Sequence, residues 1–227
     1  MTKKSLTIND VFNIRKGGNP ERAFAPQTLH RDLYNKSYLE LVGIFESRIS
    51  KWYFDVAESL SENTDSNFIV TAVCCIILDL LSQYIYGVPS SSKKCFKKFF
   101  KDHLNEYNHS IQPPIESCYY DKKKKWVKER INDISEGFYH CFRCGIVHSG
   151  RILEYGRINT LYPNEIIKII DWQKEKKEIN INPKEFLRKM REIFNNYIKN
   201  LRNNDSELKR NFINKMKLEY GMHTIPE

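Results

Sequence analysis

The stretch FIVTAVCCIILDLLSQYIY, residues 68–86, indicates the fold class most clearly. Its first three turns are apolar almost all round, which is typical of a helix buried on every side. Asp65 or Ser66 offers an N-cap before it, and Gly87 and Pro89 end it. We therefore expect these residues to form the central helix of a helical bundle.

Helical periodicity also appears on both sides of this stretch. It predicts helices at about Tyr34–Leu60, Ser90–Tyr107, Lys124–Cys144 and Pro163–Asp171, and a last long helix through Leu201. That last helix has the best-defined start, because Asn182 can cap it, Pro183 takes its first position and Glu185 follows three residues after the cap. No strand-rich block is evident, so the predicted fold is all-α.

Glycine and proline divide the chain into three predicted parts. Residues 1–33 are irregular and form an N-terminal arm. Residues 34–155 form the helical bundle. Residues 156–227 form a helical extension that ends in the long C-terminal helix, and the segment around 151–161 is a small irregular or hairpin insertion.

The chain is basic, with a formal net charge of +9 in 227 residues. The excess is local: residues 93–130 hold 11 Lys/Arg and 5 Asp/Glu, and residues 151–227 hold 16 and 11. Such a chain attracts polyanions, although charge alone does not choose among them. The N-terminus lacks the apolar run of a signal peptide, the most apolar stretch, 68–78, is too short to span a bilayer, and the six cysteines are expected to be reduced. We expect a cytoplasmic protein without membrane contact.

The run FYHCFRCGIVHSG, residues 138–150, carries candidate chemistry. Arg143 lies five positions before His148. Cleavage of RNA at its 2′-hydroxyl needs proton transfer and positive charge at the phosphate. Histidine supplies the first and the arginine fork the second.

This motif, in a helical context with a hydrophobic helical hairpin before it, resembles the signature of the HEPN superfamily. The resemblance covers roughly residues 34–155. It implies a metal-independent endoribonuclease that leaves 2′,3′-cyclic phosphate ends, often a bacterial toxin or an antiviral defence effector. It also implies a homodimer with a composite site built from Arg143 and His148, with RNA as substrate and an antitoxin or defence-system protein as a further partner. The alternative is a noncatalytic RNA- or protein-binding module.

Helix geometry sets a condition on this pair. Five positions on a straight α-helix turn by about 500°, which leaves Arg143 and His148 about 140° apart. They converge if the helix bends or ends, which Gly145 permits, or if two chains meet at a two-fold interface.

Other roles for these residues stay open. Arg143 can pair with Asp133 or Glu136, and His148 can cap a helix end. A zinc site from His140, Cys141, Cys144 and His148 lacks a second element that supplies ligands, so we expect neither a metal nor a cofactor. Asp79 is a charge inside the apolar central helix and needs a partner such as Arg48 or Arg143.

Substrate contacts are predicted on both sides of the motif. The candidates are Lys122, Lys123, Lys124, Lys125, Ser149 and Arg151. The lysine run would bind the RNA backbone without sequence preference, together with the lysines between 93 and 101.

Overall fold

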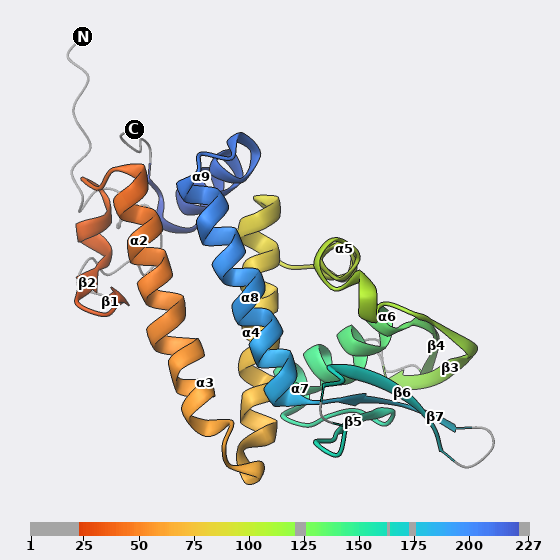
Figure 1. Cartoon of the computed structure of the whole chain (residues 1–227). Helices are drawn as coiled ribbons and strands as arrows, with labels where there is room; N and C mark the ends of the chain where they lie inside the picture. The colour runs from red at the N-terminus through yellow and green to blue at the C-terminus, as the bar shows by residue number, and fades with distance from the viewer. Residues whose placement is uncertain (1–22, 121–125, 163, 173–175, 223–227) are drawn as a thin grey trace. The chain divides into compact units, whose positions relative to one another are not determined.

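The computed structural model describes residues 23–120, 126–162, 164–172 and 176–222 (Figure 1). The described residues cluster into two compact units. Unit 1 takes its residues from Met1–Val56, Gln83–Ser90 and Phe194–Glu227. Unit 2 takes its residues from Ala57–Ser82 and Ser91–Ile193 and contains the whole Arg143–His148 motif.

The helices account for most of the described chain. The α-helices are α2 (Tyr38–Ile49), α3 (Asp55–Leu60), α4 (Asn67–Tyr86), α5 (Lys93–His103), α6 (Ile134–Phe138), α7 (Gly145–Ser149), α8 (Pro183–Arg202) and α9 (Ser206–Tyr220). Two π-helical segments, η2 (Ser50–Phe54) and η5 (Tyr139–Cys144), join neighbouring α-helices, and short 3-10 turns occur at η1 (His30–Leu33), η3 (Thr64–Ser66) and η4 (Asn105–Tyr107).

The predicted all-α class is wrong, because the chain also contains three small sheets. The strands are β1 (Ala23–Ala25), β2 (Thr28–Leu29), β3 (Ser110–Tyr120), β4 (Trp126–Asp133), β5 (Gly156–Ile158), β6 (Ile167–Trp172) and β7 (Lys176–Ile181). β1 pairs with β2 and β3 pairs antiparallel with β4. β7 lies between β5, which is parallel to it, and β6, which is antiparallel (Figure 1).

Two of the segments predicted as helices form strands instead, in whole or in part. The helix expected over 124–144 is strand β4 up to Asp133 and helical only from Ile134. The helix expected over 163–171 is replaced by β6. In both places a short apolar run fits the repeat of a helix as well as that of a strand. Pairing with β3 or β7 makes these segments strands.

The remaining helices follow the prediction more closely. The helical stretch from Tyr38 to Leu60 and helix α4 are present. Asn182 caps α8 as expected, since its side-chain oxygen accepts from the backbone N–H of Glu185 at 3.3 Å. The C-terminal part continues beyond α8 as a second helix, α9, which Asp205 caps.

Each unit has an aromatic core. In unit 1 the ring of Phe45 lies 4.4 Å from Tyr84 and 5.6 Å from Phe212, measured between centroids. In unit 2 Phe138 lies 4.9 Å from Phe142 and 5.1 Å from Phe186. Phe138 and Phe142 are fully buried. The helix that carries the motif is therefore fixed in unit 2 by its own apolar side.

One helix of the described residues, 64–86, is by length and composition long and apolar enough to cross a membrane, so the expectation that its apolar run is too short is wrong. Its most apolar window is 56% buried inside the protein. The core helix of a soluble protein meets the same criteria, and the sequence predicted such a central helix here.

Candidate functional site

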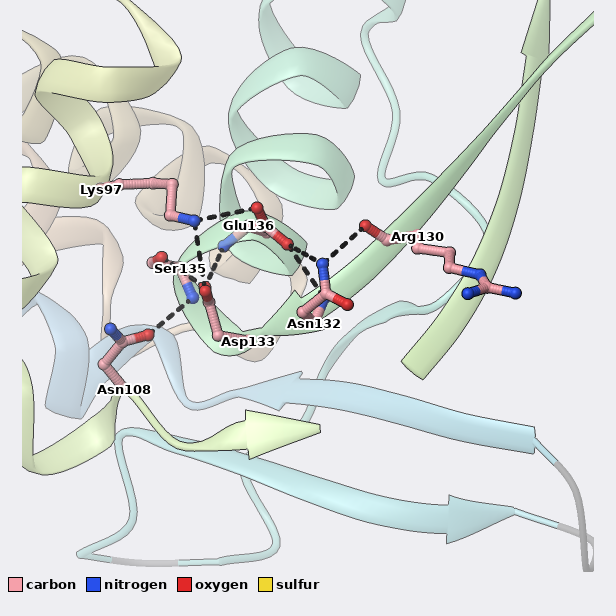
Figure 2. Close-up of polar contacts among 7 residues, drawn as sticks. All are labelled: Lys97, Asn108, Arg130, Asn132, Asp133, Ser135 and Glu136. Atoms are coloured by element: carbon pink, nitrogen blue, oxygen red, sulfur yellow. Dashed lines mark hydrogen bonds and ion pairs between the residues drawn. The ribbon is translucent and has the colours of Figure 1, made fainter. Parts of the chain in front are cut away.

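A network of polar side chains fixes the start of the motif helix (Figure 2). Asp133 is the N-cap of α6: its Oδ1 accepts from the backbone N–H of Glu136 at 2.9 Å. The carboxylate of Glu136 accepts in turn from the backbone N–H of Asn132 at 2.9 Å. Asn108 accepts from the backbone N–H of Ser135 at 3.0 Å. The N–H groups of Ser135 and Glu136, which have no partners inside the helix, are thus satisfied by side chains, and that of Ile134 donates to the backbone carbonyl of His109.

Lys97 of α5 binds both carboxylates of this network. Its Nζ lies 2.9 Å from Glu136 Oε1 and 3.3 Å from Asp133 Oδ2 (Figure 2). Burial raises the pKa of Glu136, but its hydrogen bonds from Asn132 and Lys97 outweigh burial, so the net pKa is lowered. The acids that were candidate partners of Arg143 are therefore paired with Lys97.

The helix that carries the motif changes type inside the motif. Arg143 lies in the π-helical segment η5, and His148 lies in α7. A π-helix bonds residue i to i+5, so its turn holds more residues than an α-turn, and such segments are frequent at functional sites. The straight α-helix that would separate the two side chains is therefore absent.

The helix does not break at Gly145, the residue that the sequence offered as permitting a break. Its φ of −58° and ψ of −50° are helical. The break comes at Gly150, whose φ of 61° is left-handed and ends α7. Gly145 instead permits a close approach. A Cβ on it would lie 2.5 Å from the carbonyl oxygen of Arg151.

The segment after the motif folds back on η5 through this close approach. The backbone N–H of Leu153 donates to the carbonyl of Cys141 at 3.0 Å, and that of Arg151 donates to the carbonyl of Gly145 at 3.2 Å. Through these bonds, two carbonyl groups of the motif helix accept from N–H donors that lie outside the helix.

We therefore expect Gly145→Ala to destabilise the protein and to displace the 151–153 segment. The clash is with a backbone atom, so it cannot be relieved by a rotamer change. Overpacking of this kind costs about 1–3 kcal/mol. The matched control is Gly43→Ala in α2, where a Cβ meets nothing within 4 Å. The gain in helix propensity should stabilise that variant by about 0.5–1 kcal/mol. Denaturant unfolding of both variants measures the difference, and equal stabilities would contradict the packing assigned to Gly145.

Arg143 joins three side chains of unit 2. Its Nε donates to Asp79 Oδ2 at 2.9 Å, and its Nη1 lies 3.2 Å from His148 Nε2. Its guanidinium carbon lies 5.6 Å from the centre of the Tyr139 ring. The pairing of Asp79 with Arg143, predicted from the lone charge in α4, is confirmed. Arg48, the other candidate partner, donates to Tyr220 in unit 1.

The contact between Arg143 and His148 limits which tautomer of the imidazole can form a hydrogen bond there. Arginine has N–H donors and no acceptor, so Nη1 donates and Nε2 accepts. As a hydrogen bond, this contact requires the tautomer of the neutral ring that carries its proton on Nδ1. The imidazole is exposed, whereas the side chains of Arg143 and Asp79 are 17% and 16% exposed. The arrangement holds a proton acceptor at the surface beside an anchored cation.

The ion pair between Asp79 and Arg143 is partly shielded from water. Burial opposes the charge of the guanidinium, but the charge of Asp79 and its hydrogen bond raise the pKa of Arg143 above its ordinary value. Loss of either partner would leave a partly buried charge unpaired, which is costly.

The cysteines beside the motif are thiols. Burial raises the pKa of Cys141 to about 12 and raises the pKa of Cys144 as well. Among the described residues, no three His, Cys, Asp or Glu side chains are placed to hold a metal ion.

The other predicted site residues do not join the contacts of Arg143 described above. The side chains of Ser149 and Arg151 are exposed directly after His148. Lys122, Lys123, Lys124 and Lys125 lie outside the described residues. Tyr139 and Ser91, which the sequence did not single out, belong to the same cluster: Ser91 Oγ donates to Asp79 Oδ1 at 2.9 Å. The sequence did not indicate a role for Ser91, because the run Ser90-Ser91-Ser92 is typical of a loop between two helices.

Comparisons with known proteins assign no family to this chain. No family model, curated protein or solved structure matches it. Its function therefore has to be inferred from its own residues.

Proposed function

We propose that this chain is a metal-independent endoribonuclease of the HEPN type, with Arg143 and His148 as its catalytic residues. The observation that carries the proposal is the contact of Arg143 Nη1 with His148 Nε2 within one chain, on a guanidinium held by Asp79. A cytoplasmic toxin or defence effector, countered by an antitoxin or partner protein, is the setting that the motif's resemblance supports.

The geometry suits transesterification of RNA. The 2′-oxygen attacks phosphorus and forms a new P–O bond, while the bond from phosphorus to the 5′-oxygen breaks. The 2′-hydroxyl takes the place of Arg143 Nη1 at the single lone pair of His148 Nε2, and Nε2 then accepts its proton. Arg143 keeps its Nε on Asp79 and offers its remaining N–H donors, those of Nη1 included, to phosphate oxygens. The leaving 5′-oxygen takes up a proton from solvent water, and His148 later returns the 2′ proton to solvent, so the products are a 2′,3′-cyclic phosphate and a 5′-hydroxyl.

Analysis of the product ends tests this reaction. A single-stranded RNA cut by the purified chain in excess chelator should carry 2′,3′-cyclic phosphate ends. Replacement of the 2′-hydroxyl by hydrogen at the cleaved position should prevent the cut, because the nucleophile is removed. Products with 3′-hydroxyl ends would contradict the mechanism. Binding without any cleavage would instead favour the noncatalytic module.

Helix α5 provides exposed cations for the RNA backbone. Lys94, Lys98 and Lys101 are exposed at positions i, i+4 and i+7, and Lys98 also lies 3.5 Å from Asp102. Lys97 differs, because Asp133 and Glu136 bind it. We include the three exposed lysines in the proposed RNA-binding surface; Lys122 to Lys125, which lie outside the described residues, stay candidates from the sequence alone.

RNA affinity should fall steeply with salt, since cations that contact phosphates release counterions. For single strands each contact contributes about 0.7 to the slope of log K against log salt. We expect Lys94→Gln, Lys98→Gln and Lys101→Gln together to lower this slope by up to about 2. Lys97→Gln on the same helix is the control and should leave it nearly unchanged. Kd values across a salt series in a His148→Ala background measure the effect. An unchanged slope in the triple variant would remove α5 from the surface.

We also propose that the chain forms a homodimer. Ile69 and Ile76 on α4 are 48% and 43% exposed and lie seven residues apart on one face, and Val147 beside His148 is 48% exposed. Exposed apolar side chains of this kind suit burial against a second copy. Because Arg143 and His148 meet within one chain, the dimer is not required to bring them together; it would place two such pairs in one cleft.

Light scattering tests this assembly. We expect twice the chain mass of 27.0 kDa for the wild type at micromolar concentration. Ile76→Glu should shift the mass toward one chain, because a charge is costly in an apolar interface. Leu39→Glu, at a 56% exposed apolar residue of α2, is the control and should stay dimeric. A wild-type monomer would contradict the homodimer.

A further inference from the structure

Ser91 holds the carboxylate that anchors Arg143. It lies between α4 and α5, twelve residues after Asp79, and both residues belong to unit 2. Its Oγ donates to Asp79 Oδ1 at 2.9 Å, while Asp79 Oδ2 accepts from Arg143 Nε at 2.9 Å. The two carboxylate oxygens therefore face different partners.

This division of the oxygens determines how the carboxylate is turned. The last torsion of an aspartate is broad, so the carboxylate rotates easily unless its oxygens are held. The hydroxyl of Ser91 selects the orientation in which Oδ2 meets Nε. The guanidinium is a rigid plane, so the position of Nε also sets the direction of Nη1, which meets His148.

We infer that Ser91 is a positioning residue of the Arg143–His148 site and acts through Asp79. Its effect on catalysis rests on the proposed function. Its effect on the geometry of His148 does not, because the contacts of Ser91 with Asp79, of Asp79 with Arg143 and of Arg143 with His148 exist without substrate.

The adjacent serine provides a matched control. Ser92 is the N-cap of α5, and its side chain accepts from the backbone N–H of Cys95 at 3.2 Å. Ser92→Ala should lower the stability of the fold through the lost cap and leave the carboxylate of Asp79 in place. Ser91→Thr keeps a hydroxyl and serves as the conservative variant.

Nitrogen NMR of the His148 ring tests the inference without any assay of activity. In the wild type and in Ser91→Thr we expect the neutral ring to carry its proton mainly on Nδ1, because Arg143 occupies Nε2. In Ser91→Ala the fraction protonated on Nε2 should rise. Ser92→Ala should resemble the wild type. An unchanged ring in Ser91→Ala, or the same change in both alanine variants, would overturn the inference.

Kinetics provide the second readout. We expect Ser91→Ala to lower kcat by on the order of 10-fold with KM little changed, less than the ~10²-fold that a 1 Å misplacement can cost. In an Asp79→Asn background the same change should cost nothing more, since residues that act through one another are not additive. A full second loss in that background would overturn the route through Asp79. A wild type that fails to cut RNA would refute the proposed function, and the NMR result would still decide the role of Ser91.

Discussion

His148→Ala is expected to lower the rate of RNA cleavage by about 10²–10⁴-fold, the usual contribution of a general acid–base group. The imidazole is exposed, so its removal should change the free energy of unfolding by no more than about 0.5 kcal/mol. RNA binding should persist, because the proposed backbone contacts lie elsewhere. Single-turnover cleavage, measured beside a binding titration, separates the two effects.

His109→Ala is the control for this variant. His109 is also exposed in unit 2 and lies just before β3. Its contact with the motif helix is made by its backbone carbonyl, which accepts from Ile134 N–H. Its side chain has no part in the proposed reaction, so the rate should be unchanged. Equal losses in the two variants would contradict the role of His148.

Arg143→Lys is expected to lower the cleavage rate by on the order of 10²-fold, similar to the loss of one preorganised donor in other enzymes. The charge is kept and the planar fork is lost. A single ammonium has to replace a guanidinium that now reaches Asp79 through Nε and His148 through Nη1. We expect kcat to fall more than KM rises.

Arg151→Lys is the matched control, which separates the loss of the planar guanidinium from any effect of positive charge alone. Arg151 is exposed, and its contact with the motif helix is made by its backbone N–H. A lysine there keeps the charge available to phosphate, so the rate should change little. Comparable losses in Arg143→Lys and Arg151→Lys would mean that Arg143 acts only as a diffuse positive charge.

The sequence predicted the long helices because their patterns are unambiguous. Helix α4 is apolar on almost every side, and α8 has a cap, a proline and an acid in the expected order. The strands were missed where the spacing of apolar residues fits a helix as well as a strand. Ile131 is buried in β4 and Ile134 in α6, so one helical stripe was read across a strand–helix junction. Asp133 followed three residues later by Glu136 was the available signal for a helix start at that point.

The candidate site was predicted in part. Arg143 and His148 were recognised from their spacing, and Asp79 from its charge in an apolar helix. The contact between Arg143 and His148 was not predictable, because it depends on the π-helical segment η5, and no residue pattern in the sequence indicates a π-helix there. Ser91 was missed because its contact with Asp79 joins residues twelve apart across a helix end.

The measurement that tests the central claim most directly is the incubation of single-stranded RNA with the purified chain in excess chelator, with wild type and His148→Ala side by side. We predict cleavage by the wild type, with 2′,3′-cyclic phosphate ends, and almost none by the variant. Equal cleavage by both proteins, or wild-type cleavage only after a divalent metal is added, would contradict a metal-independent site at Arg143 and His148.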